Sequence, residues 1–543
     1  MIQAFKRVTV WVPLIIAAAL ALGIWLGSLL FGGRNNHESD AYGKIQTILD
    51  YVDRDYVDAV DTDSLLEAAI PELLSQLDPH TAYIPAEDLK AANDELRGSF
   101  SGIGITFNML TDTITVVEVL SGGPSEKVGL LAGDRIITID DSIVSGKNWS
   151  QEKVVNTLRG PEDTKVKLGV KRDNADKMLT FTVTRGEIPM TSIDAAYMID
   201  DEIGYVKVNK FSETTYDEFL NAMAQLRYDG AKKYILDLRS NGGGMMDAAI
   251  RMANEFLSSG DVIVSTKGRK EEMNAVSRAN GLGSFQKEDL TVLIDEYSAS
   301  ASEILAGAIQ DNDRGLIIGR RSFGKGLVQQ QIDLPDQSAI RLTVARYYTP
   351  SGRCIQKSYS PGSTDEYLNE IAERYNHGEG FNADSILIDR SQIFHTVGGR
   401  EVFGGGGIIP DIYVPNDTAG ISKYYISVFN AGLLHKYSFK YIDSNRHRLE
   451  QALDVPELLS MLPPDDQLLN DFVNYAHREG KIAPRWYYIN ISRNLILDIL
   501  KSMIARDIFG TSAYYEVIND TDISVQRAVS ETREGHAAKP VRE

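Results

Sequence analysis

The chain has 543 residues, of which 43% are hydrophobic and 24% are charged, proportions typical of a folded globular protein. Its formal net charge of -20 disfavours a nucleic-acid partner, because an acidic surface repels phosphate groups. The single cysteine, Cys354, cannot form an intramolecular disulfide, and neither an HExxH motif nor a tight His/Asp cluster indicates a metal site. At roughly 100–200 residues per domain, the length predicts about three or four domains.

The N-terminal segment predicts a membrane anchor. Lys6 and Arg7 precede a charge-free, largely apolar run at 8–33, and a helix that crosses a bilayer needs about 20 such residues. Basic residues at the short end favour a cytoplasmic location for 1–7, which places the rest of the chain on the periplasmic or extracytoplasmic side of the inner membrane in a single pass. A long signal peptide that is cleaved is the alternative, and it exports the same body.

Residues 41–97 are predicted to be an N-terminal helical segment. Apolar residues recur there at three- and four-residue spacing along one face: Ile45, Ile48, Leu49 and Val52. Within this segment, the stretch LDPHTAY at 77–83 predicts a turn between helices.

A small domain of mixed strands with two helices is predicted at 98–187, where the apolar period changes from helical to alternating. Four residues near its start form a short glycine-containing strand: Gly102, Ile103, Gly104 and Ile105. Exposed amides in such a strand can bind a terminal carboxylate while a peptide adds to the sheet edge. The alternative is an ordinary strand with a glycine bulge.

Residues 188–415 alternate between predicted strands and helices, which indicates an α/β core. Two apolar strands, 233–238 and 290–295, have the composition of buried strands. The remaining 416–543 are predicted to be mostly helical, and their role stays open between oligomerisation and partner binding. The fold class is therefore multidomain α/β with an N-terminal transmembrane helix.

The segment SASASE at 298–303 lies directly after a buried predicted strand and directly before a predicted helix. A serine at such a turn exposes its hydroxyl, and the amide that follows it points outward from a helix N-terminus. A serine here is therefore a candidate nucleophile, and the next amide is a candidate oxyanion donor. Ser300-x-x-Glu303 also has the spacing of a helix capping box, and this motif alone favours the cap.

The segment SFGKGLVQQ at 322–330 places Lys325 between two glycines, just ahead of a predicted strand. If the strand extends back to Lys325, its side chain and that of Gln329 share one face. A lysine acts as a general base only when it is neutral, and burial among apolar neighbours favours that form. Gln329 could then orient the amine without adding a charge. The ordinary alternative is a solvent-facing lysine at a turn.

The segment DLRSNGGGMMD at 237–247 is an apolar predicted strand that runs into three glycines and then a helix. Glycine-rich turns of this kind let backbone amides approach a ligand closely. A phosphate loop is disfavoured, because GxxxxGK[ST] and GxGxxG are both absent. A second oxyanion donor and a plain flexible turn remain the two interpretations.

Taken in order, these motifs resemble one family, the carboxyl-terminal processing peptidases, also called tail-specific proteases, of serine peptidase family S41. The similarity runs from about 41 to 415. Further segments that carry it lie after the lysine motif: RLTVARYYTPSGRCIQ at 341–356 and GGGGIIPDIYVP at 404–415.

The resemblance implies a role for each matching position. The 98–187 unit is expected to be the PDZ domain, with its glycine-containing strand as the carboxylate loop, and 188–415 the protease core. Neither a metal nor another cofactor is expected. The implied site residues are the nucleophile Ser300, the general base Lys325, its support Gln329, and the oxyanion donors Ala301 and Gly243.

The expected function is that of a serine endopeptidase, which recognises C-terminal tails through its PDZ domain and processes or degrades exported proteins. The expected partners are polypeptide substrates, the membrane through the N-terminal helix, and a homo-oligomer such as a dimer, but no nucleic acid. Two alternatives remain at this point: a catalytically silent PDZ scaffold, and a signalling protease that cuts one membrane partner.

Overall fold

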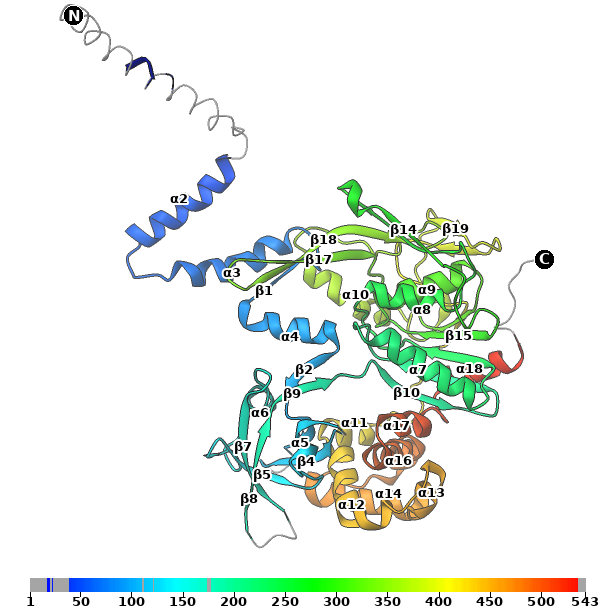
Figure 1. The fold of residues 1–543 in the computed structure, drawn as a ribbon. Helices are drawn as coiled ribbons and strands as arrows, with labels where there is room; N and C mark the ends of the chain where they lie inside the picture. Colours follow the sequence, from blue (N-terminus) through cyan, green and yellow to red (C-terminus); the bar gives the residue numbers. More distant parts are fainter. Residues whose placement is uncertain are drawn as a thin grey trace, which may run out of the picture. The chain divides into compact units, whose positions relative to one another are not determined.

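The computed structural model describes residues 17–19, 22, 39–109, 112–120, 122–172 and 177–535 (Figure 1). It contains two compact units, Met1–Leu74 and Ser75–Glu543. The predicted anchor at 8–33 lies almost entirely outside the described residues. Among the helices that are described, none is long and apolar enough to cross a membrane.

The predicted helical segment at 41–97 is divided between the two units. The first unit holds α2 (Ser39–Asp55) and most of α3 (Thr62–Ser75), whereas α4 (Ala86–Arg97) belongs to the second. Between α3 and α4 lies a short strand, β1 (Ala82–Ile84), that the helical periodicity did not predict. Its three residues are too few to show an alternating pattern.

The 98–187 region folds around an antiparallel sheet in the order β3-β4-β5-β7-β8, so that β3 is an edge strand. Alternate residues of its strands, such as Val166 and Leu168, are fully buried against Val154 of α6. A separate pair, β2 with β9, joins the start of the region to its end. The elements of the region are β2 (Ser99–Gly102), β3 (Ile105–Asn108), β4 (Ile114–Val119), α5 (Pro124–Lys127), β5 (Arg135–Ile139), β6 (Ser142–Ile143), α6 (Gln151–Leu158), β7 (Lys165–Lys171), β8 (Leu179–Thr184) and β9 (Gly186–Pro189).

The core of the second unit is a six-stranded sheet in the order β10-β11-β12-β15-β16-β21. Only the pairing of β10 with β11 is antiparallel, and the other neighbours are parallel. The apolar strands predicted at 233–238 and 290–295 form its centre, where both faces are buried. The strands are β10 (Ile193–Met198), β11 (Ile203–Val208), β12 (Lys233–Asp237), β15 (Asp289–Ile294), β16 (Leu316–Gly319) and β21 (Ile412–Tyr413).

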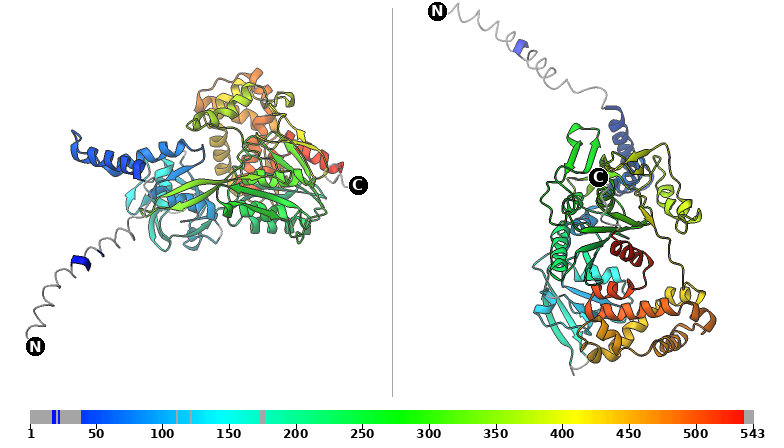
Figure 2. Two further views of the ribbon diagram at one scale, coloured as in Figure 1. Left: turned by 90° about the horizontal axis from the view of Figure 1, so that it is seen from above. Right: turned by 90° about the vertical axis from the view of Figure 1, so that its right-hand side faces the viewer.

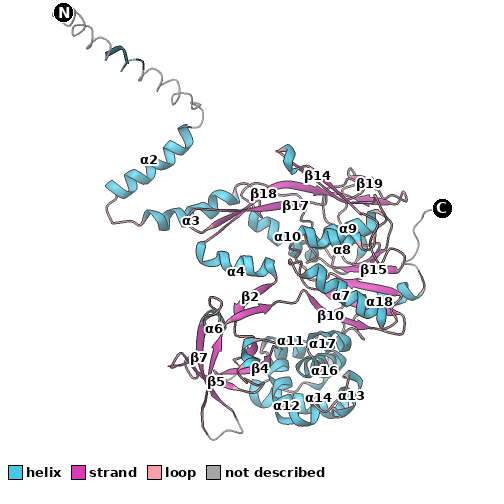
Figure 3. Ribbon diagram, viewed as in Figure 1, coloured by secondary structure: helices cyan, strands magenta, loops and turns pink. Residues whose placement is uncertain are grey.

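Helices cover both faces of this sheet (Figures 1 and 3). Leu236 and Val292 share a buried cluster with α7 (Thr215–Tyr228), α8 (Met246–Asn254) and α9 (Ala301–Asp311). Ile235 and Leu293 instead share a cluster with α18 (Ile523–Arg533), the last helix of the chain.

The helices of the region 416–543 pack in two different places. Its first helices pack together around Phe472 and Leu500, whereas α18 lies on the core sheet against β12, β15 and β16 (Figure 2). Asp522 caps the N-terminus of α18 and also pairs with Arg239 at 2.9 Å, next to the glycine-rich turn. The helices before α18 are α11 (Lys423–Asn430), α12 (Leu433–Leu449), α13 (Val455–Met461), α14 (Asp465–Gly480), α15 (Trp486–Ile491), α16 (Arg493–Phe509) and α17 (Thr511–Ile518).

A second, antiparallel sheet flanks the core and carries the strand that follows Lys325. In this sheet β18 pairs with β1, β13 and β17. Its strands are β13 (Val262–Gly268), β14 (Ala275–Arg278), β17 (Leu327–Asp333) and β18 (Ala339–Tyr348). The remaining elements are α10 (Thr364–Asn376), the strand pair β19 (Ile393–His395) and β20 (Glu401–Phe403), and two short 3₁₀ turns.

Candidate active site

Ser300 lies in the tight turn between β15 and α9, at the carboxyl end of a parallel strand. Its backbone has φ 55° and ψ −112°, a conformation that L residues rarely adopt and that costs free energy. Such a turn projects the serine side chain away from the sheet. Ser300 accordingly lines a cavity of about 720 Å³.

The capping-box interpretation of Ser300-x-x-Glu303 holds for the backbone. Ser300 is the N-cap residue of α9, and its amide donates a hydrogen bond to the Glu303 carboxylate at 2.9 Å. The amides of Glu303 and Ile304 donate to the carbonyl oxygen of Ser300, at 2.9 and 3.0 Å. The Ser300 hydroxyl is therefore not required to hold the start of the helix.

Lys325 lines the same cavity and is paired with Gln329. The amine Nζ donates to Gln329 Oε1 at 2.9 Å, and Gln329 Nε2 donates in turn to the carbonyl oxygen of His80. The strand β17 begins only at Leu327, so the pair does not depend on a strand that reaches back to Lys325. No direct hydrogen bond joins Lys325 to Ser300 in the part of the chain that the structure describes.

The surroundings of Lys325 favour its neutral form. Burial lowers the pKa of its amine, and the positive charge of Arg341 acts in the same direction. The carboxylates of Glu303 and Asp78 oppose this shift but do not reverse it. Gln329 adds a hydrogen-bond acceptor without a charge, so the lysine is held in place while its basic, neutral form is preserved.

Glu303 connects the serine loop to the lysine loop. Besides the Ser300 amide, its fully buried carboxylate accepts hydrogen bonds from the Ser322 hydroxyl at 2.5 Å and from the amides of Gly324 and Lys325 at 2.7 and 2.9 Å. Burial raises the pKa of Glu303 to about 7, although these hydrogen bonds favour the charged form. One side chain thus holds the backbones of both candidate catalytic residues.

The turn at 77–83 supports the lysine from the other side. Asp78 closes it by accepting the amides of His80 and Thr81, both at 2.9 Å, and the Thr81 hydroxyl at 2.6 Å. The His80 ring contacts the hydroxyl of Tyr367 at 2.8 Å. Burial and then the charge of Lys325 lower the pKa of His80 to about 4, so the ring is neutral near pH 7.

The two predicted oxyanion donors differ in their surroundings. The amide of Ala301 donates no hydrogen bond within the described residues and is available at the N-terminus of α9. The amide of Gly243 donates to Asn241 Oδ1 at 2.9 Å. The next amide, that of Gly244, has no acceptor among the described residues and is the second available donor of this turn.

Gly243 packs directly against the nucleophile turn. A Cβ atom at this position would lie 2.7 Å from the Cβ of Ser300 and 3.0 Å from the amide nitrogen of Ala301. Its φ of 100° is also unfavourable for any residue with a side chain. The glycine run therefore brings its backbone to within contact of Ser300, as the sequence motif allows.

The predicted tail-binding residues lie in the 98–187 region and do not line the cavity that contains Ser300. Ile103 and Gly104 sit between β2 and the edge strand β3, and Gly104 has a φ of 74°. Their amides donate no hydrogen bonds within the described residues, whereas their carbonyl groups accept from Ser125 and Leu120 at 3.0 and 3.1 Å. Free amides beside a free strand edge are what a peptide terminus would need.

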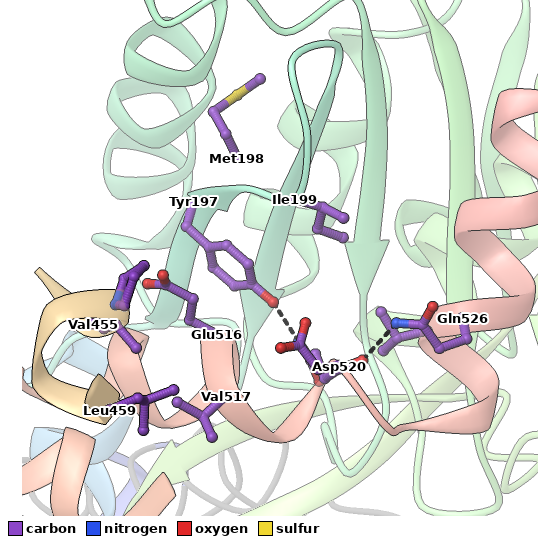
Figure 4. A pocket seen from close by; sticks show the side chains of 12 residues that line it. Tyr197, Met198, Ile199, Val455, Leu459, Glu516, Val517, Asp520 and Gln526 are labelled. Atoms are coloured by element: carbon purple, nitrogen blue, oxygen red, sulfur yellow. Dashed lines mark hydrogen bonds between the residues drawn. The ribbon is translucent and has the colours of Figure 1, made fainter. Parts of the chain in front are cut away.

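A second cavity, of about 310 Å³, lies between β10 and the C-terminal helices (Figure 4). Tyr197 points into it and accepts a hydrogen bond from Asn519 at 2.8 Å, while Glu516 and Asp520 line its polar side. It contains no lysine, serine or histidine. No group of three or more His, Cys, Asp or Glu residues in the described part of the chain could hold a metal ion.

Sequence reasoning missed three contributors to the site. Glu303 was interpreted only as a capping residue, and its spacing gives no sign of the contacts it makes to 322–325. His80 supports Gln329 through its carbonyl group, which any residue possesses. Arg341 belongs to a segment that the family resemblance includes, but no motif marked it as part of the cavity.

Profiles of known families match three parts of the chain. The profile of Peptidase family S41 matches 202–364, and that of the PDZ domain matches 101–184. A family of unknown function, DUF8443, matches 424–510.

Three relatives are informative. The carboxy-terminal-processing protease of Bartonella bacilliformis is 40% identical over 394 residues, which are 70% of this chain and 87% of that protein. A probable CtpA-like serine protease of Staphylococcus aureus is 32% identical over 334 residues, 61% of this chain and 66% of that protein. The solved photosystem II D1 C-terminal processing protease is 30% identical, with a TM-score of 0.34, over 60% of this chain and 86% of that chain.

These matches define the class of the protein as a serine-type peptidase with a PDZ domain. The chain belongs to peptidase family S41, among the carboxy-terminal-processing proteases. The predicted family and enzyme class are confirmed, and so is the mixed α/β content. The predicted domain boundaries and the individual roles of the site residues stay predictions.

Proposed function

We propose that the chain is an endopeptidase in which Ser300 is the nucleophile and Lys325 the general base, and which selects substrates by their C-terminal tails. The observation that carries this proposal is the meeting of both residues in one cavity, with Lys325 partly buried and paired to the uncharged Gln329. The free edge of β3 and the free amides of Ile103 and Gly104 support tail binding in the PDZ domain.

The first step is attack of the Ser300 hydroxyl oxygen on the carbonyl carbon of a substrate peptide bond. The hydroxyl proton passes to the neutral amine of Lys325. The amide of Ala301, with an amide of the glycine turn, stabilises the oxyanion; the free amide of Gly244 serves directly, whereas Gly243 must first leave Asn241.

The tetrahedral intermediate then collapses, and the C–N bond breaks. Lys325 returns its proton to the leaving amine nitrogen, and the N-terminal part of the substrate stays esterified to Ser300. A water molecule gives a proton to Lys325 and attacks the ester, which releases the acid product and restores the serine.

The test is proteolysis of a loosely folded protein by the full chain in detergent. We expect Ser300→Ala and Lys325→Ala each to lower kcat by at least about 10³-fold, because the first variant lacks the nucleophile and the second lacks the general base. Ser298→Ala is the matched control, since this buried hydroxyl bonds to the carbonyl group of Leu238 at 2.9 Å. Cleavage by Ser300→Ala at the wild-type rate would assign the nucleophile elsewhere.

The location of the enzyme is part of the same proposal. The apolar run at 8–33, behind Lys6 and Arg7, supports a single inner-membrane anchor with the catalytic body on the extracytoplasmic side. Fusing a periplasmic reporter after Glu543 should give activity outside the cytoplasm, and a cytoplasmic reporter at the same point should be inactive. The reverse pattern would reject this topology.

A further inference from the structure

One arginine in the catalytic cavity has no partner. Arg341, on β18, lines the cavity together with Ser300 and Lys325. Among the described residues its guanidinium forms neither an ion pair nor a hydrogen bond, and its Nη2 atom is buried without a partner. An unsatisfied buried group of this kind destabilises the fold unless something else compensates for it.

Three buried arginines of the core show how this chain treats a guanidinium that is removed from water. Arg353 pairs with Asp311 at 2.8 Å, Arg374 with Glu370 at 2.6 Å, and Arg321 with Glu379 at 2.5 Å. Each is neutralised by a carboxylate of the protein itself. Arg341 departs from this pattern, and it does so in the cavity where substrate must bind.

The residue opposite Arg341 on the neighbouring strand also has one buried polar atom without a hydrogen bond among the described residues. Gln331 on β17 is its direct partner in the antiparallel register, and the Oε1 atom of Gln331 is likewise buried without a hydrogen bond. Paired residues on adjacent strands share a face, and so does Gln329, two residues earlier on β17. Gln329, Gln331 and Arg341 therefore form a polar row that leads from Lys325 along the cavity wall.

We propose that Arg341 is a binding site for a carboxylate of the substrate, placed inside the catalytic cavity and distinct from the PDZ domain. This inference rests on the proposed peptidase function. A planar guanidinium takes two carboxylate oxygens at once, which suits it to this ligand. The carboxylate belongs either to an acidic side chain or to the C-terminus of the substrate, since a peptide chain offers these two anions.

Two acidic residues of the protein, Glu95 and Asp247, also line the cavity, but neither pairs with Arg341 in the described structure. They leave the guanidinium available, whereas the other lysine of the cavity wall, Lys210, lies near the carboxylate of Glu95. A substrate carboxylate bound at Arg341 would set the register of the chain relative to Ser300.

Occupation of Arg341 would also act on the general base. The charges that face Lys325 are Arg341 from β18, Glu303 from α9 and Asp78 from the turn before β1, with His80 neutral beside it. A bound carboxylate neutralises the charge of Arg341, so Lys325 then holds a proton more readily. This makes the neutral amine a stronger acceptor for the proton of Ser300 but lowers the fraction of Lys325 that is neutral.

The experiment compares full-length wild type, Arg341→Met and Arg346→Met on peptide pairs. One pair carries Glu or Gln at successive positions around the cleavage site with an identical free tail, and a second pair ends in a free acid or an amide. Arg346 is the matched control because it lies on the same strand but is exposed and outside the catalytic cavity. Binding to the Ser300→Ala form of each variant is measured in parallel.

We expect wild type and Arg346→Met to favour one carboxylate peptide over its neutral partner about tenfold, and Arg341→Met to lose that preference. Loss confined to the Glu/Gln pair identifies a side chain, and loss confined to the acid/amide pair identifies a C-terminus. A tail preference that arises in the PDZ domain would survive in Arg341→Met.

An unchanged preference in Arg341→Met, in cleavage and in binding, would overturn the proposal. Arg341→Lys keeps the charge, and we expect it to retain part of the preference; it replaces Arg341→Met if that variant fails to fold. The binding measurements on Ser300→Ala keep the test independent of the proposed catalytic mechanism. If wild type cuts no peptide while its Ser300→Ala form discriminates between the pairs, the catalytic proposal fails and the carboxylate site stands.

Discussion

The two loops that meet in the active site are held in opposite ways. The nucleophile loop, 298–303, is fixed by its own strand and helix, β15 and α9, and by a strained backbone at Ser300. The base loop, 322–326, has no regular secondary structure and is fixed by distant residues. The serine is therefore placed mainly by the strand and helix on either side of it, with further hydrogen bonds from its loop to Leu238 and Asn241, whereas placement of the lysine depends on more distant parts of the fold.

Distant residues hold the base loop and the neighbouring Gln329, among them residues of α10, Gln356 and the turn at 77–83. Arg374 on α10 donates to the carbonyl groups of Ser322 and Phe323 at 2.8 and 3.0 Å. The side-chain oxygen of Gln356 accepts a hydrogen bond from the amide of Gly326 at 2.7 Å. In the turn at 77–83, the carbonyl oxygen of His80 accepts a hydrogen bond from the side chain of Gln329. The position of the base therefore depends on contacts from several separate parts of the chain.

Glu303 is an exception to this contrast, because it lies on α9, the helix that directly follows Ser300, and also accepts hydrogen bonds from the base loop. In Glu303→Gln, one acceptor oxygen becomes an amide donor that faces amides already pointing toward it. Each hydrogen bond to a buried charge contributes about 1.5–3 kcal/mol, so we expect kcat to fall roughly 100-fold or more. Steady-state kinetics on a peptide substrate, with circular dichroism to verify folding, measure this effect.

A matched control is Glu296→Gln. Glu296 is also buried and bonded, but to Arg320 at 2.7 Å and away from the cavity. We expect this variant to lose stability while its kcat stays within about threefold of wild type. Equal losses of kcat in both variants would mean that Glu303 acts only through general stability.

The next largest effect concerns the nucleophile loop alone. In Gly243→Ala the new methyl group would meet the Cβ of Ser300 at 2.7 Å, in a backbone conformation that disfavours side chains. Strain of about 1–3 kcal/mol is expected at such a position, and kcat should fall roughly 10- to 100-fold. Gly242→Ala is the control, because nothing lies within 4 Å of its added methyl group. Equal kinetics for the two variants would show that the contact is not needed.

The same contrast explains what the sequence could predict. Ser300, the amide of Ala301 and the glycine turn lie within a strand–turn–helix pattern that is visible over a dozen residues. The Lys325–Gln329 pair is also local. By contrast, His80 and Gln329 are 249 positions apart, and only the antiparallel pairing of β1 with β18 brings the turn beside β17.

The C-terminal helices show a further limit of the same kind. Their helical character follows from the sequence, but an apolar helix face does not specify which surface it covers. Val525, Ala528 and Val529 of α18 pack on the core sheet, whereas neighbouring helices pack on one another. Within 416–543, α18 therefore packs on the core sheet, and the helical pattern of the sequence does not indicate that surface.

The pH profile sharpens the comparison, because each loop contains one titrating group. Activity requires Lys325 to be neutral and Glu303 to be charged, and both conditions fail as the pH falls. With the Glu303 pKa raised to about 7, kcat/KM should fall below about pH 7 by up to about tenfold per pH unit for this group, and protonation of Lys325, whose pKa is lowered by burial, adds to the decline.

Acid inactivation can be separated from unfolding by the sign of the Glu303 contribution. A carboxyl group with a raised pKa in the folded state favours folding at low pH and loses that contribution as the pH rises toward 7. The melting temperature at pH 6 should therefore not fall because of Glu303, even though activity does. A constant kcat/KM between pH 5 and 8 would contradict the roles given to both groups.

The smallest effect is expected at the most distant support of the base. Asp78→Asn keeps the oxygen that accepts from the amides of His80 and Thr81 and from the Thr343 hydroxyl, but it replaces the oxygen that accepts from the Thr81 hydroxyl at 2.6 Å. The turn then loosens, Gln329 loses a fixed acceptor, and kcat should fall about three- to tenfold with KM unchanged, about 1 kcal/mol for one weakened hydrogen bond. Asp61→Asn, which alters a similar turn in the first unit, should have no kinetic effect. A loop that is held from several sides should tolerate the loss of one contact. If Asp78→Asn lowered kcat as much as Glu303→Gln does, the turn at 77–83, and not Glu303, would be what holds Lys325 in place.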